Sequence, residues 1–103
     1  METYNLIFSE LAYNDLEEIV IFISRDSKVN AINFYNKLIE TIDKLKTFPM
    51  LGILIPDKKM SEKGYRMLIV NNYIAFYKIH NKDVQVLRVL HGSRGYPRLF
   101  RSI

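Results

Sequence analysis

Cysteine and tryptophan are absent from this sequence of 103 residues, and glycine and proline are scarce, with four and three residues. The lack of cysteine excludes disulfide bonds and thiolate chemistry and argues against a zinc site. No apolar run exceeds five residues, which is far short of a membrane span. The opening residues METYNLIFSE lack the basic region and apolar stretch of a secretory signal. We therefore expect a cytoplasmic protein that has no membrane contact, no metal and no organic cofactor.

Acidic residues are nearly absent from the second part of the chain. Residues 1–63 carry eight Lys and Arg against ten Asp and Glu, whereas residues 64–103 carry seven against one, Asp83. The two balances, −2 and +6, make up the net charge of +4. This asymmetry predicts that the C-terminal part faces a polyanion or an acidic protein. A solvated basic surface explains the charge equally well.

The composition is that of a small globular protein. Hydrophobic residues make up 49% and charged residues 25% of the chain, which is too apolar for a disordered segment. A chain of this length is too short for two separate cores. We expect one domain, residues 1–103.

The sequence pattern in the first half of the chain predicts a short strand and two helices. Residues 4–8 alternate as a strand does, and Ser9 follows as the N-cap of a helix. Asp26 or Ser27 can cap a second helix that runs to about Thr47 before Pro49 ends it. Each helix has an apolar stripe at helical spacing; the stripes are Ala12, Leu16, Ile19, Val20 and Ile23, and Ala31, Tyr35, Leu38, Ile42 and Leu45.

Ile21 and Phe22 do not belong to the first stripe. Ile21 points to nearly the opposite side of the helix from Ile23, and Phe22 lies on the flank. Both can be scattered apolar surface residues, which need no explanation. They are also candidates for contact with a partner protein.

The second half predicts a loop and three strands. Residues 49–63 contain Pro49, Gly52, Pro56 and a polar cluster, and they read as one long loop. Strands follow at 65–70, 73–79 and 84–91, separated by turns at Asn71-Asn72 and at 80–83. The order is β-α-α-β-β-β. This order predicts an α+β fold in which a helical hairpin packs against a small, mainly antiparallel sheet.

The stretch GYRMLIVNNYIAFYKIHNKDVQVLRVLHGSRGY, residues 64–96, resembles the RelE/ParE toxin family. Members of the ParE-like branch commonly show Gly-Tyr-Arg before the first of three closing strands and an aromatic-rich second strand. Their last strand ends in a Leu-Arg-Val-Leu-His-Gly-x-Arg pattern, which is residues 87–94 here. The order and spacing of these motifs, rather than any one of them, carry the resemblance, which covers nearly the whole chain.

The resemblance implies the toxin of a bacterial type II toxin–antitoxin system. Such a toxin is neutralised by a small antitoxin that wraps around the sheet and helices, so a hetero-oligomer is expected. An acidic antitoxin would suit the basic C-terminal part. Ile21 and Phe22 are the candidate antitoxin contacts.

The family contains two mechanisms of growth inhibition. RelE-type members are endoribonucleases that cut messenger RNA on the ribosome, whereas ParE-type members inhibit DNA gyrase. Metal-free RNA cleavage needs a proton acceptor, a proton donor and a cation near the phosphate. His91 is the candidate acid or base, with Arg66, Arg94 and Tyr96 as its possible neighbours.

Other basic residues are candidates for contact with nucleic acid or with the target; they are Lys58, Lys59, Lys63, Arg88, Arg98 and Arg101. Arg88 can instead pair with a carboxylate. We favour for His91 a strand-end role in which the ring hydrogen-bonds the backbone. Many RelE-type members carry an arginine directly after the first tyrosine of the middle strand, where this chain has Ile74. We therefore expect gyrase inhibition through the basic tail from Arg94 to Arg101, with ribosome-dependent RNA cleavage as the alternative.

Overall fold

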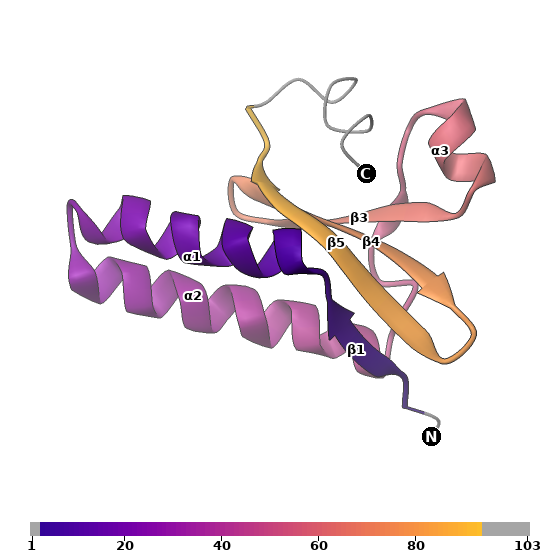
Figure 1. Ribbon diagram of the computed structural model, residues 1–103, viewed down its shortest axis with the longest axis horizontal. Helices are drawn as coiled ribbons and strands as arrows, with labels where there is room; N and C mark the ends of the chain where they lie inside the picture. The colour runs from indigo at the N-terminus through magenta and orange to yellow at the C-terminus, as the bar shows by residue number, and fades with distance from the viewer. Residues whose placement is uncertain (1–2, 94–103) are drawn as a thin grey trace.

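The computed structural model describes residues 3–93 and shows a helical hairpin beside a five-stranded sheet (Figure 1). Its elements are β1 (Asn5–Phe8), α1 (Glu10–Ser24), α2 (Lys28–Asp43), the 3-10 turn η1 (Lys44–Lys46), β2 (Ile53–Leu54), α3 (Lys58–Glu62), β3 (Tyr65–Val70), β4 (Tyr73–His80) and β5 (Asp83–His91). The α+β class predicted from the sequence is confirmed. No helix within residues 3–93 has the length and apolar character needed to cross a membrane.

Serine side chains start both long helices. The Ser9 hydroxyl accepts a hydrogen bond from the backbone N–H of Ala12 at 3.0 Å, and the Ser27 hydroxyl accepts one from Asn30 at 3.1 Å. Each serine thereby satisfies a backbone donor that the first helical turn leaves without a partner. The predicted caps are confirmed, and Ser27 rather than Asp26 caps the second helix.

The predicted apolar stripes of α1 and α2 form most of the contact with the sheet. Ala12, Leu16 and Ile19 are buried in the main core, and so are Leu38 and Ile42 on α2. The prediction that Tyr35 belongs to the buried stripe of α2 was wrong. Tyr35 is 39% exposed, and its neighbour Phe34 packs against the core instead. Both residues lie near the edge of the stripe, where helical spacing alone cannot separate them.

The prediction that residues 49–63 form one loop was also wrong. This segment contains the two-residue strand β2 and the five-residue helix α3. Asp57 caps α3, because its carboxylate accepts from the backbone N–H of Met60 at 3.0 Å. Elements this short show no measurable hydrophobic period, so the sequence pattern could not reveal them.

The sheet has the strand order β1-β5-β4-β3-β2, and its last three strands form the predicted antiparallel meander. Asn71 and Asn81 sit in the two hairpin turns with φ of 54°, a left-handed conformation that asparagine tolerates. β1 pairs with β5 in parallel, along Asn5–Phe8 and Asp83–Val86. β1 therefore connects β5, the last described strand, to the helical hairpin.

Two apolar clusters lie on the two faces of the sheet. The larger one joins the sheet to α1 and α2 and contains the fully buried Tyr77. The smaller one, around Ile55 and Phe76, is covered in part by Met60 of α3. The two long helices thus cover one face, while α3 covers part of the other.

Candidate functional site

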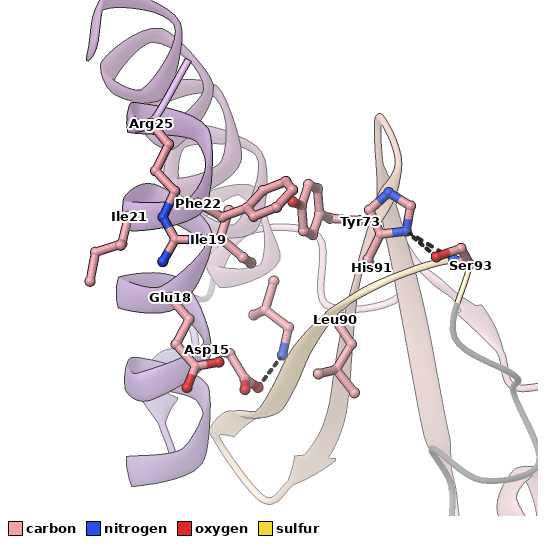
Figure 2. A pocket seen from close by; sticks show the side chains of 11 residues that line it. Asp15, Glu18, Ile19, Ile21, Phe22, Arg25, Tyr73, Leu90, His91 and Ser93 are labelled. Carbon is pink, nitrogen blue, oxygen red and sulfur yellow. Dashed lines mark hydrogen bonds between the residues drawn. The ribbon is translucent and has the colours of Figure 1, made fainter. Parts of the chain in front are cut away.

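An open groove of about 730 Å³ lies between α1 and the ends of β4 and β5 (Figure 2). It is lined by Asp15, Glu18, Ile19, Ile21, Phe22, Arg25, Tyr73, Val89, Leu90, His91 and Ser93. The topology explains its position. β1 pairs with β5 only as far as Val86, so the second half of β5 has no neighbouring strand on its outer side within the described residues. α1 stands opposite this free edge and forms the other wall.

An ion pair joins the two walls at the base of the groove. The Asp15 carboxylate accepts from Nε of Arg88 at 2.8 Å and from Nη2 at 3.0 Å, and it also accepts from the backbone N–H of Val89 at 2.9 Å. The hydrogen bond with Asp15 raises the pKa of Arg88 above its ordinary value. Both side chains are largely buried, so the Arg88 guanidinium is engaged within the fold. Its predicted contact with a target would require this pair to open.

The upper wall of the groove is apolar and exposed. Ile21 is 49% exposed and Phe22 is 64% exposed, and both line the groove (Figure 2). Phe22 departs from the core stripe of α1 because its ring points into the groove, whereas the Ile21 side chain lies at the rim and points away from Tyr73 (Figure 2). Tyr73 faces Phe22 from β4 and packs on Phe34, with ring centroids 5.1 Å apart. Burial raises the pKa of Tyr73, so its hydroxyl stays protonated well above neutral pH.

His91 closes one end of the groove with its ring oriented by the backbone. Its Nδ1 accepts from the backbone N–H of Ser93 at 3.0 Å and lies 2.7 Å from the Ser93 hydroxyl. Because a backbone N–H can only donate, Nδ1 of the neutral ring carries no proton, and Nε2 carries it instead. The ring also meets Tyr73 edge-on, with centroids 5.1 Å apart. His91 therefore makes the backbone hydrogen bond expected of a strand-end histidine.

The structure does not bring Arg66 to His91. Tyr73 lies opposite both Val70 and His91 in the sheet register, so Arg66 is four residues along β3 and two strands away from His91. At about 3.3 Å per residue and 4.8 Å per strand, their Cα atoms are roughly 16 Å apart. The Arg66 guanidinium points the other way, with Nη2 donating to the carbonyl of Gly52 at 2.9 Å. The prediction that Arg66 lies beside His91 is therefore wrong.

The predicted basic contacts are spread over separate parts of the molecule. Lys58 and Lys59 lie exposed on α3, and Lys63 follows that helix, at the other end of the sheet from α1 (Figure 1). Four other candidates, Arg94, Tyr96, Arg98 and Arg101, lie outside the described residues. No group of three His, Cys, Asp or Glu side chains within residues 3–93 is arranged to hold a metal ion.

Asp15 and Tyr73 are among the groove residues that the sequence did not indicate as site residues. Asp15 had a visible signal, because it falls between Ala12, Leu16 and Ile19 on the buried side of the helix. A carboxylate at such a position needs a partner. Tyr73 gave no such signal, because only its pairing with His91 at the end of β5 makes it part of the groove.

Comparison with known proteins places this geometry in a family. The family model described as the ParE toxin of type II toxin–antitoxin systems, parDE, matches residues 6–96. No curated protein matches the sequence significantly.

Two solved structures resemble the fold over most of its length. One is a chain of the chromosomal ParDE toxin–antitoxin system from P. aeruginosa, with a TM-score of 0.71 and 18% sequence identity over 86% of this chain and 96% of that one. The other is a chain of the toxin–antitoxin complex RelBE2 from Mycobacterium tuberculosis, with a TM-score of 0.64 and 20% identity over 88% and 93% of the two chains. At these identities the likeness establishes the fold.

Proposed function

Since the chain belongs to the ParE toxin family of type II toxin–antitoxin systems, we propose that it stops growth by binding and inhibiting DNA gyrase. It is the toxin component of such a system. Gyrase is the target that the ParE branch implies. An inhibitor of this kind needs a binding surface and no catalytic group.

The observation that carries the proposal is that the described arginines considered as partners of His91 are engaged elsewhere or separated from it. Arg88 is paired with Asp15, and Arg66 donates to backbone carbonyls far from His91. Arg25 also lines the groove, but Phe22 and Tyr73 lie between it and His91 (Figure 2). None of these three arginines is therefore placed beside His91 as the cation that metal-free RNA cleavage requires.

The groove provides a place for the antitoxin. Its wall of Ile21 and Phe22 suits an apolar side chain. In the part of the chain that the structure describes, the outer edge of β5 has no neighbouring strand beyond Val89, whose N–H is bound by Asp15, and this end of the strand suits an extended backbone. The similar ParDE and RelBE2 chains come from toxin–antitoxin systems. We therefore assign the groove to the cognate antitoxin, a small acidic protein that complements the basic second part of this chain.

The target is tested by inducing the toxin briefly without antitoxin and measuring plasmid supercoiling and messenger RNA integrity in the same cells. We expect negative supercoiling to be lost while transcripts stay intact. In a purified assay, the toxin should block supercoiling by gyrase and leave relaxation by a type I topoisomerase unchanged.

His91→Ala is the matched variant, because it removes the acid–base candidate that the sequence predicts for RNA cleavage. Under the gyrase proposal this variant stays inhibitory. If the toxin cleaves transcripts while supercoiling stays normal, and if His91→Ala loses this cleavage, the RelE-like endoribonuclease alternative would replace the proposal.

A further inference from the structure

The segment that contains β2, at the edge of the sheet opposite the groove, is apolar. Residues 47–56, TFPMLGILIP, contain no charged side chain. Five large apolar residues in this segment are 45–72% exposed, and we call them the apolar edge: Phe48, Met50, Leu51, Ile53 and Leu54. Ile53 and Leu54 form β2, the outermost strand on this side of the sheet, and the other three precede β2 in the chain. Proteins usually protect such an edge with charged side chains.

The backbone of the apolar edge is held firmly from its inner side. The buried Tyr77 hydroxyl accepts from the backbone N–H of Gly52 at 2.9 Å and donates to the carbonyl of Pro49 at 2.7 Å. Arg66 donates to the carbonyl of Gly52 through Nε at 3.2 Å and Nη2 at 2.9 Å. The exposure of the apolar side chains is therefore built into the fold, as it would be in a preorganised binding surface.

Gly52 shows how closely this segment is fitted to the sheet. A Cβ atom at this position would lie 2.5 Å from the carbonyl oxygen of Met67 and 2.8 Å from the Tyr77 ring. Only glycine lets the backbone approach this closely. The close approach fixes where the side chains on either side of Gly52 point.

The size of the apolar edge fits a protein interface. Its five side chains expose roughly 600 Å² together, which is at the upper end for the largest apolar patch of a monomer. A typical stable interface buries about 800 Å² per partner. The backbone of β2 and Ile69 of β3, which is 57% exposed, add to the available area.

We propose that the apolar edge joins two copies of this toxin, with the two β2 strands antiparallel across a two-fold axis near Leu54. A two-fold axis brings each surface against itself, so like charges would repel. Residues 47–56 carry no charge, and Arg66 of the neighbouring strand is hydrogen-bonded to the carbonyl of Gly52, although each chain carries a net charge of +4. Pairing of the two edges would continue the sheet from one copy into the next. The inference rests on the apolar edge alone and is independent of the target of the toxin.

The dimer leaves both antitoxin grooves open. The groove lies beside β4 and β5, whereas β2 is at the other end of the strand order β1-β5-β4-β3-β2. Each copy can then bind its own antitoxin without separating the pair.

A single introduced cysteine tests the proposal, because the chain contains none. Residues opposite each other across an antiparallel pair have Cα atoms about 4.5–5.5 Å apart, which a disulfide can span. Leu54→Cys should therefore become a covalent dimer under mild oxidation of the purified full chain. Val29→Cys is the matched control: Val29 is 66% exposed on α2, away from the apolar edge, and this variant should stay monomeric.

Sedimentation of the unmodified protein gives the second measurement. We expect a mass approaching 24.4 kDa, twice the chain mass of 12.2 kDa, at tens of micromolar protein. Ile53→Lys should raise the dimer dissociation constant at least 100-fold, while Val29→Lys should not change it. Circular dichroism establishes that each variant is folded.

Three results would overturn the dimer. They are a monomer mass at every concentration up to about 100 µM, a dimer that Ile53→Lys leaves intact, and equal crosslinking at residues 29 and 54. If the toxin is monomeric and Ile53→Lys abolishes growth inhibition, the apolar edge contacts the target instead. The measurements of mass and crosslinking do not depend on whether gyrase is inhibited.

Discussion

Asp15 is the charged residue on which the position of α1 over the sheet depends most directly. It is 7% exposed, and its carboxylate binds both the Arg88 side chain and the backbone of β5. A buried ion pair adds little net stability compared with apolar residues of the same size, but removing one partner leaves a buried charge alone. The pair therefore acts mainly by fixing how the helix meets the strand.

We predict that Asp15→Ala lowers the free energy of unfolding by about 3 kcal/mol, because the Arg88 guanidinium loses its partner. Urea unfolding followed by circular dichroism measures the change. Asp43→Ala is the control, since the Asp43–Lys46 pair is about half exposed, and its loss should cost about 0.5 kcal/mol or less. Similar losses in the two variants would show that the Asp15 pair is no stronger than a surface one.

At the scale of elements, the long helices and the three-stranded meander were predictable, while β2 and α3 were not. The helices have clear caps and periodic stripes, and the Asn71 turn permits a tight hairpin. β2 is a strand only because it pairs with β3 at Met67 and Arg66 and because Tyr77 binds the backbone beside it. These partners lie 12 to 25 residues later in the chain, so no local pattern could indicate them.

We predict that Tyr77→Phe destabilises the protein by about 1–3 kcal/mol, because the Gly52 N–H and the Pro49 carbonyl lose their shared partner. Thermal and urea unfolding measure the loss. Tyr13→Phe removes a hydroxyl from a ring that is 60% exposed and should change stability by less than about 0.5 kcal/mol. An unchanged stability in Tyr77→Phe would mean that water replaces the lost hydroxyl.

At the scale of the whole molecule, the two ends of the sheet carry different apolar surfaces. The groove at β5 combines apolar residues with a buried ion pair and an oriented histidine. The apolar edge at β2 has exposed side chains on a firmly held backbone. We assign the groove to the antitoxin and the apolar edge to a second copy of the toxin.

This assignment predicts that only one of two phenylalanine variants loses affinity for the antitoxin. Phe22→Asp should weaken binding of the acidic protein encoded beside the toxin at least 30-fold, because a central aromatic contact is worth about 2 kcal/mol or more. Phe48→Asp, at a residue that is 57% exposed at the other end of the sheet, should leave this affinity unchanged. Calorimetric titration of each folded variant measures it. If Phe22→Asp binds the antitoxin as tightly as the unmodified toxin does, Ile21 and Phe22 are ordinary surface residues and not antitoxin contacts.

The sequence by itself determined the class of the fold, the caps, the two core stripes and the resemblance to the toxin family. These properties are encoded by residues close together in the chain, through helical period, strand alternation and turn chemistry. It also indicated that Ile21 and Phe22 do not belong to the core.

Only the tertiary structure decided which chemical groups are available for function. Asp15 and Arg88 are 73 residues apart in sequence and neutralise each other, and Arg66 is turned away from His91 toward the backbone of residues 50–52. A charge in the sequence has no fixed role until its neighbours are known, because an ion pair depends on distance in space. The sheet order therefore determined that the described residues form a groove and an apolar edge rather than the predicted group of Arg66 and His91.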